Sequence, residues 1–319
     1  MIVTFTANPS LDRTATLDRP LTRGEVHRVE AVTVEGAGKG VNVARVLFDA
    51  GQDVRALLPA GPSDPILPAL AAIGLPHEAV PISEAVRTNL TLTEADGTTT
   101  KINEPGPTLS PEQVEACTAL VLGAARGADW VVLSGSLPPG APVDWYARLA
   151  TALRPLGCRV AVDTSDAPLQ ALIDALPDAG FDFIKPNSDE IAQLTGGDAK
   201  ELEAAARRGD PRPVAQAARS LMERGIAAVL VTLGAAGAVL VTAEGAWYAP
   251  APDIPVRSTV GAGDSSVAGY ILAAVRGESP ERRLRTAVAY GSAAAGLPGT
   301  SLPKPGDADP EVATATPIE

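Results

Sequence analysis

The sequence predicts an α/β fold with a mostly parallel central sheet, and two observations support this fold class. From residue 110 onward, short apolar runs alternate with helical stretches, the pattern of βα units around a parallel sheet that helices cover on both faces. Residues 13–35 and 86–104 break this pattern, because their apolar and polar residues alternate as in half-exposed strands. We expect these two segments to pair as one small, separate sheet.

The elements of the core follow in order from the apolar patterns. Strands are predicted at residues 2–7, 54–60, 130–134, 159–163, 181–184 and 227–232. Helices are predicted to begin at Gly40 and near Asp264, and to span residues 66–73, 189–195 and 281–295. A turn at Ala95-Asp96-Gly97 is predicted between the last two strands of the small sheet.

These elements divide the chain into a core, an insert and a tail. The core domain is predicted to comprise residues 1–12, 36–85 and 105–302, and the small sheet residues 13–35 and 86–104. Residues 303–319 are rich in Pro, Asp and Thr, a composition that predicts a disordered tail.

Composition limits the partners of the chain. A formal charge of −12 over 319 residues argues against binding to nucleic acid or acidic membranes, both of which attract basic proteins. Only two histidines occur, and Cys117 and Cys158 stand far apart, which argues against a histidine-rich metal centre, a Ser-His-Asp triad and a disulfide. The start of the sequence does not resemble a signal peptide, and no run of about twenty apolar residues occurs. We therefore expect a cytoplasmic protein.

A glycine-rich turn directly before a helix is the strongest local pattern. It reads Ser258-Thr-Val-Gly-Ala-Gly-Asp264, and apolar residues at helical spacing follow it. The N–H groups and positive dipole end of such a helix favour an anion. Asp264 on that turn suits a general base beside a transferring phosphoryl group, although it could also serve only as a helix cap.

Other polar turns each allow two interpretations. Gly36-Ala-Gly38-Lys39-Gly40 opens a helix and could hold an anion, but it lacks the hydroxyl residue of a P-loop after its lysine. Asp12 suits either a turn or the binding of sugar hydroxyls. Asn187-x-x-Glu190 suits a helix cap or a magnesium site, and the glycine turn from Thr232 to Gly237 suits a hairpin or the wall of a nucleotide site.

Taken together and in order, these patterns resemble those of the PfkB (ribokinase-like) carbohydrate kinases, over about residues 2–300. The resemblance is to the branch of 1-phosphofructokinases, tagatose-6-phosphate kinases and minor 6-phosphofructokinases. It is carried by Asn8-Pro-Ser-Leu-Asp12, Gly38-Lys-Gly-Val-Asn42, Arg87-Thr-Asn89, Asn103-Glu-Pro-Gly106, Ser134-Gly-Ser-Leu-Pro-Pro-Gly140, Lys185-Pro-Asn-Ser-Asp-Glu190 and Thr259-Val-Gly-Ala-Gly-Asp264. The resemblance implies a three-layer ribokinase-like sandwich whose small sheet is a lid, and homodimers that form through this lid.

The resemblance also implies the role of each residue in an ATP- and Mg²⁺-dependent kinase. Asp264 would be the base, and the N–H groups of Gly261, Ala262 and Gly263 the anion hole. The nucleotide and magnesium side would comprise Lys185, Asn187, Thr232, Gly234 and Gly237, with Glu190 holding magnesium through water. The sugar-phosphate side would comprise Asp12, Arg28, Gly38, Lys39, Asn42, Arg87, Lys101 and Asn103.

The implied substrate is a ketohexose phosphate. Residues 99–106, Thr-Thr-Lys-Ile-Asn-Glu-Pro-Gly, are most similar to the branch that converts fructose 1-phosphate to fructose 1,6-bisphosphate. Kinase activity on fructose 6-phosphate or tagatose 6-phosphate is the nearest alternative. A non-catalytic sugar-phosphate sensor is an alternative from a different functional class.

Overall fold

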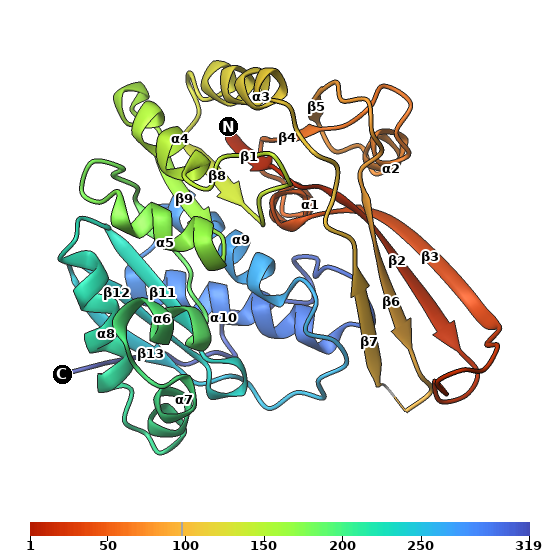
Figure 1. Cartoon of the computed structure of the whole chain (residues 1–319). Helices are drawn as coiled ribbons and strands as arrows, with labels where there is room; N and C mark the ends of the chain where they lie inside the picture. The colour runs from red at the N-terminus through yellow and green to blue at the C-terminus, as the bar shows by residue number, and fades with distance from the viewer. Residues whose placement is uncertain (97) are drawn as a thin grey trace.

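The structure is a computed structural model, and it describes residues 1–96 and 98–319. Its larger sheet is mostly parallel, as predicted (Figure 1). In spatial order it contains β14 (Thr316–Pro317), β13 (Gly245–Ala249), β12 (Ala238–Thr242), β11 (Ala228–Thr232), β10 (Phe183–Ile184), β9 (Arg159–Asp163), β8 (Trp130–Ser134), β1 (Ile2–Thr6), β4 (Val54–Pro59) and β5 (His77–Val80). In this spatial order, adjacent strands from β11 through β5 are parallel, whereas β12, β13 and β14 form an antiparallel edge of the sheet.

Helices cover both faces of this sheet, so the core has three layers. Successive strand residues point to opposite faces, and accordingly Ile2 and Val3 of β1 belong to different apolar clusters. One cluster is covered by α1 (Lys39–Asp49), α2 (Ile66–Ala72), α9 (Ala262–Val275) and α10 (Pro280–Gly296). The other is covered by α3 (Pro111–Ala124), α4 (Trp145–Leu153), α5 (Asp166–Asp174), α6 (Ser188–Thr195), α7 (Ala199–Arg207) and α8 (Arg212–Met222). No helix in the described part of the chain is long and apolar enough to cross a bilayer.

The two alternating segments pair with each other, as predicted, in a second sheet that we call the lid. Its strands lie in the order β3 (Val29–Ala37), β2 (Ser10–Leu17), β6 (Arg87–Thr93) and β7 (Thr99–Asn103). Directly opposite residues share a face of a sheet, so Asp12, Glu35 and Asn89 lie on one face and Ala15, Val32 and Leu92 on the other. Part of the turn predicted at residues 95–97 lies outside the described residues.

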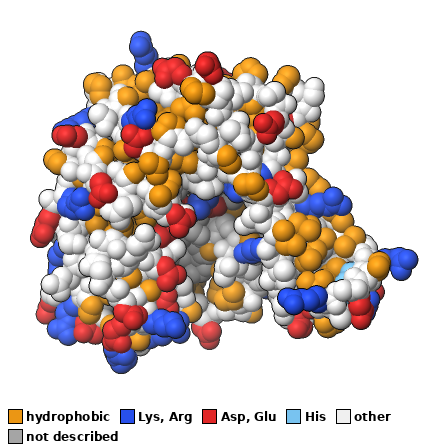
Figure 2. Space-filling view, viewed as in Figure 1, with side chains coloured by type: hydrophobic (Ala, Val, Ile, Leu, Met, Phe, Trp, Pro, Cys, Tyr) orange, Lys and Arg blue, Asp and Glu red, His pale blue; other side chains and the backbone are white. Residues whose placement is uncertain are grey.

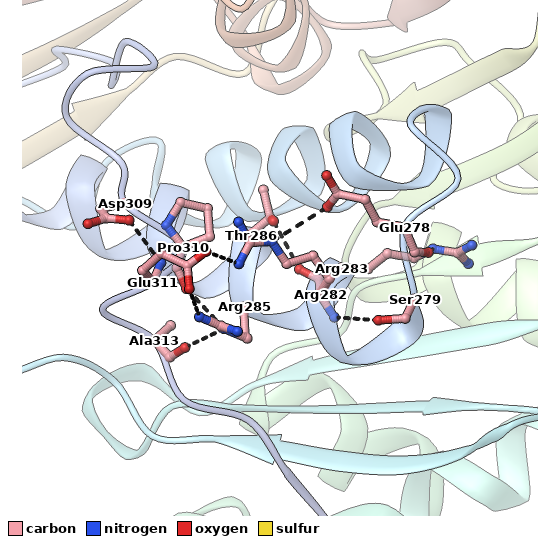
Figure 3. A network of polar contacts seen from close by, with 10 residues as sticks. All are labelled: Glu278, Ser279, Arg282, Arg283, Arg285, Thr286, Asp309, Pro310, Glu311 and Ala313. Carbon is pink, nitrogen blue, oxygen red and sulfur yellow. Dashed lines mark hydrogen bonds and ion pairs between the residues drawn. The ribbon is translucent and has the colours of Figure 1, made fainter.

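The prediction of a disordered tail at residues 303–319 is wrong. Arg282 and Arg285 of α10 both form ion pairs with Glu311, and Arg285 Nε also donates to the backbone oxygens of Pro310 and Ala313 (Figure 3). Ala313 is buried, and β14 pairs with β13 at the sheet edge. The polar composition suggested disorder, but arginines of a preceding helix and the open edge of the sheet supply partners for this segment.

Candidate active site

Asp264 lies in the first turn of α9 and is almost fully buried, with 6% of its surface exposed. Gly261 precedes the helix with a left-handed φ of 74°, and Ala262 and Gly263 begin it with N–H groups that no helical carbonyl can accept. The Asp264 carboxylate does not cap the helix. Its Oδ2 accepts a hydrogen bond from Asn42 Nδ2 of α1 at 2.8 Å instead. The interpretation of Asp264 as only a cap is therefore wrong.

Two lysines and a further carboxylate lie beside this turn. A Cβ atom at Gly263 would lie 3.2 Å from Lys185 Nζ, so the ammonium group of Lys185 lies against the turn. Asp163 ends β9 with 1% of its side chain exposed, and it forms ion pairs with Lys39 Nζ at 3.2 Å and Lys185 Nζ at 3.5 Å. Gly38 directly precedes Lys39 and has a φ of 112°. A Cβ atom at Gly38 would lie only 2.7 Å from the side chain of Thr6 in β1.

Asp163 has no role among those predicted from the sequence. The sequence predicts only that a strand ends there, although the carboxyl end of a parallel strand is where ligand groups gather. The two lysines that pair with Asp163 come from other parts of the chain: Lys39 is the first residue of α1, and Lys185 directly follows β10. Only the folded sheet brings the three charges together.

Burial and neighbouring charges shift the pKa values of this group. Burial raises the pKa of Asp264 to about 6, against the opposing effect of the Lys39 charge. Burial alone would also raise the pKa of Asp163, but Lys185 and Lys39 hold it below its usual range. Burial alone would lower the pKa of Lys39, but nearby carboxylates, Asp163 first, raise it. Lys39 therefore stays cationic, while Asp264 titrates close to neutral pH.

The Asn187-x-x-Glu190 turn forms the predicted cap of α6. Asn187 Oδ1 accepts from the Glu190 N–H at 2.8 Å, and Glu190 Oε2 accepts from the Asn187 N–H at 2.9 Å. Burial raises the pKa of Glu190. Asn187 also bridges to Thr232 at the end of β11, from which a 3₁₀ turn (Gly234–Ala236) and Gly237 lead into β12. Of the two interpretations of this turn, the hairpin is confirmed, because β11 and β12 pair antiparallel, and the hairpin lies directly beside the Asn187 turn.

Asp12 and Arg87 lie close together where the lid joins the core. Asp12 Oδ1 accepts hydrogen bonds from Ser10 Oγ at 2.8 Å and from Asn89 Nδ2 at 3.0 Å. Arg87 Nη1 donates to the backbone oxygen of Glu104 at 3.3 Å. Its Nε is buried without a hydrogen-bond partner among residues 1–96 and 98–319, so an anionic ligand would supply the acceptor that it lacks. Burial lowers the pKa of Arg87, and the charge of Asp12 opposes this effect.

One of the predicted substrate residues, Arg28, lies away from this group. Lys101 and Asn103 lie exposed on β7, the edge strand of the lid, but on the same face as Asp12, because Asn103 is directly opposite Asn89. Arg28 is exposed and precedes Val29, which begins β3 at the far end of the lid from Asp12. The separation along β2 is about 16 Å, at about 3.3 Å per residue. The structure thus does not bring Arg28 to the site of its own chain.

A hollow separates the core from the lid (Figure 2). Within the described ranges, no three His, Cys, Asp or Glu side chains are grouped to hold a metal ion. Mg²⁺ commonly takes one or two carboxylates and completes its shell with water and substrate phosphates. The buried carboxylate of Glu190, on the turn that follows Lys185, suits an ion of that kind.

Comparisons with known proteins agree with this arrangement. Residues 6–306 match the family model described as pfkB family carbohydrate kinase. The chain is 37% identical to 1-phosphofructokinase of Rhodobacter capsulatus over 308 residues, which cover 95% of this chain and 93% of that protein. It is 35% identical to 1-phosphofructokinase of Escherichia coli (strain K12), covering 92% and 90% of the two chains.

A solved structure supports the same assignment. Phosphofructokinase-2 from Escherichia coli, in complex with substrates and products, superposes with a TM-score of 0.87 at 31% identity, covering 96% of each chain. The expected ribokinase-like fold is therefore confirmed. With a family model that matches nearly its whole length and relatives this similar, the chain belongs to the pfkB family of carbohydrate kinases.

Proposed function

We propose that this protein is a 1-phosphofructokinase, which transfers the γ-phosphoryl group of ATP to fructose 1-phosphate and forms fructose 1,6-bisphosphate. One observation carries the chemistry: a buried carboxylate, Asp264, lies at the N-terminus of α9 beside the ammonium groups of two lysines. The names of the similar bacterial proteins support the choice of sugar.

In this proposal, Asp264 acts as the general base. Its carboxylate takes the proton of the sugar 6-hydroxyl while that oxygen attacks the γ-phosphorus, and the bond from this phosphorus to the bridging oxygen of ADP breaks. A carboxyl whose pKa is about 6 is mostly ionised at neutral pH. It is also a stronger base than an ordinary aspartate, which suits proton transfer in the transition state.

The turn at residues 261–264 and the lysines stabilise the transferring group. Phosphoryl transfer depends mainly on positioning and on neutralising the charge of the equatorial oxygens. First-turn N–H groups supply donors, and Lys185 lies against Gly263. Asp163 holds Lys185 and Lys39 in fixed positions through ion pairs. The donors are therefore in place before the substrate arrives, which reduces the cost of reorganisation.

The two substrates occupy opposite sides of Asp264. On the lid side, Asp12 would accept hydrogen bonds from sugar hydroxyls, and the unpaired Nε of Arg87 would bind the sugar phosphate. On the core side, Asn187 and Thr232 would bind the nucleotide, with Gly234 and Gly237 as its wall. Glu190 would hold Mg²⁺ through water, and the ion would neutralise charge on the ATP phosphates.

A coupled assay of ADP release tests the choice of sugar. We expect the highest kcat/KM with fructose 1-phosphate, lower values with fructose 6-phosphate and tagatose 6-phosphate, and none with unphosphorylated fructose. A preference for fructose 6-phosphate would favour the alternative that phosphofructokinase-2 represents, with the phosphate and the attacking hydroxyl exchanging ends. No turnover of fructose 1-phosphate would exclude the proposal.

The pKa of Asp264 predicts how the rate depends on pH. Because only the ionised carboxylate accepts a proton, kcat/KM should fall tenfold per pH unit below about pH 6. The hydrogen bond from Asn42 lowers the pKa of Asp264, so Asn42→Ala should move this acid limb to higher pH. Steady-state rates from pH 4.5 to 8.5 provide the measurement. An acid limb centred below pH 5, or one that Asn42→Ala moves downward, contradicts the assignment.

We further propose that two copies associate through the outer face of the lid. Apolar side chains gather there (Figure 2) around a shallow hollow of about 390 Å³. The side chains of Val32, Val34 and Ile102 are 39%, 54% and 55% exposed. All three lie on the face of the lid away from Asp12. An exposed apolar patch on a small sheet is typical of a protein interface.

A charge on this face should separate the two copies. Val32→Glu with Ile102→Glu is expected to convert a dimer into a monomer in light scattering at micromolar concentration, because the charges would be buried without partners. Val143→Glu is the control, since Val143 is 50% exposed outside the lid and should leave the mass unchanged. A wild-type protein that is monomeric at 50 to 100 µM would refute the lid interface.

A further inference from the structure

Glu35 joins the lid to two separate parts of the core. It lies in β3 directly opposite Asp12, on the same face of the lid. Its Oε1 accepts from Arg45 Nη2 of α1 at 2.9 Å, and its Oε2 accepts from Thr300 Oγ1 at 2.8 Å. Arg45 also donates to the backbone oxygen of Gly36 at 3.3 Å. Each carboxylate oxygen therefore connects β3 to a different segment.

The segment around Thr300 touches both the lid and the anion-binding turn. A side chain on Gly299 would begin 3.4 Å from Thr14 of β2, and one on Gly261 would begin 2.7 Å from Leu302 Cδ2. Thr300 itself is 9% exposed. Residues 299–302 thus lie between the lid strands and the first residue of the turn that leads to Asp264.

The other partner of Glu35 leads to the same place. Arg45 and Asn42 are three residues apart on α1, which places them on the same side of the helix, and Asn42 donates to the Asp264 carboxylate. Arg45 also neutralises Glu35, whose charge lies directly across from Asp12, where two like charges would repel each other. Glu35 is therefore connected to the start of α9 in two ways. One runs through Arg45 and α1, whose Asn42 bonds to Asp264, and the other through Thr300, in the segment that lies beside Gly261.

We infer that Glu35 and Thr300 are positioning residues for the sugar-phosphate side of the site, a role that rests on the function proposed above. Neither would touch the reacting atoms. The Thr300–Glu35 hydrogen bond fixes the lid strand opposite Asp12 relative to Gly261, and so fixes the distance between the groups that bind the sugar and those that bind the transferring phosphate. Substitutions at the joint between a closing element and a core commonly change KM and kcat together.

The location of this joint predicts an asymmetric effect. Asp12 and Arg87 lie on the lid, whereas Lys185, Asn187 and Thr232 lie in the core sheet and its loops. Loosening the joint should therefore weaken binding of the sugar phosphate and leave binding of ATP almost unchanged. A purely structural contact would instead lower the melting temperature and leave both KM values of the folded enzyme unchanged.

Thr300→Val tests this inference, because it removes the hydroxyl and keeps the shape. We expect the KM for fructose 1-phosphate to rise about tenfold, which corresponds to the loss of one hydrogen bond to a charged group, and kcat to fall. The KM for ATP should stay within about twofold of wild type. Thr300→Ser, which keeps a donor, should restore most of the loss, and Glu35→Ala should have at least the effect of Thr300→Val.

Thr151→Val is the matched control, because its hydroxyl donates within α4 to Ala147 and is distant in sequence from the joint. Wild-type kinetics in Thr300→Val would overturn the inference, as would an equal rise in both KM values or a failure of Thr300→Ser to recover. These outcomes differ from a failure of the proposed function, which would appear as no turnover of fructose 1-phosphate by the wild-type enzyme in the same assay.

Discussion

Replacing Asp264 by Asn is expected to lower kcat by about 10²–10⁴-fold, the usual contribution of a general base. Asparagine has nearly the same shape and can still bond to Asn42, but it cannot take the proton of the attacking hydroxyl. The KM for the sugar phosphate should change little, since Asp12 and Arg87 lie outside this turn. Coupled assays of ADP release at pH 7.5 with saturating substrates provide the measurement.

Two comparisons make this result specific to the base. Asp49→Asn changes an exposed aspartate at the end of α1 and should retain wild-type kcat. Calorimetric titration with fructose 1-phosphate should show that Asp264→Asn still binds the sugar. If the variant kept more than a tenth of wild-type kcat, Asp264 would not be the base. If the wild type and the variant bound sugar phosphate equally and neither consumed ATP, the sensor interpretation would apply.

The parts of the fold that could be predicted are those that local patterns determine. A glycine turn followed by helical apolar spacing predicted a helix near Asp264, and α9 begins at Ala262 and ends two residues before Gly277. Alternating polarity at residues 13–35 and 86–104 predicted a separate sheet, because such strands expose one face. The large sheet followed from the βα alternation, whose parallel strands must bury both faces.

What could not be predicted depends on partners that lie far away along the chain. The hydrogen bond between Asn42 and Asp264 spans 222 residues, and that between Glu35 and Thr300 spans 265. Asp163 resembled any small polar loop residue until two lysines were found on either side of it. The tail has a composition typical of disorder, but Glu311 meets two arginines of α10. Tertiary pairing decided these cases, and local composition does not report it.

Asp163→Asn is expected to affect both stability and rate. Lys185 is 5% exposed and Asp163 1% exposed, and removing one member of a buried ion pair typically costs about 3–5 kcal/mol of unfolding free energy. The pair with Lys39 adds less, because 38% of the Lys39 side chain is exposed. We also expect kcat to fall at least tenfold, since Lys185 would no longer be held against the anion-binding turn. Urea unfolding and steady-state kinetics measure the two effects.

A double variant separates these two effects. Asp163→Asn combined with Lys185→Met leaves only the partly exposed Lys39 without its ion pair, so much of the lost stability should return, because buried ion pairs are often replaceable by uncharged groups. The rate should not return, since the ammonium group that faces the phosphate is absent. Asp182→Asn serves as a control, because Asp182 accepts the backbone N–H of Val160 in β9 and forms no ion pair within the described residues. If the double variant regained both stability and rate, Lys185 would only support the fold, and the anion-binding turn would have to act without its ammonium group.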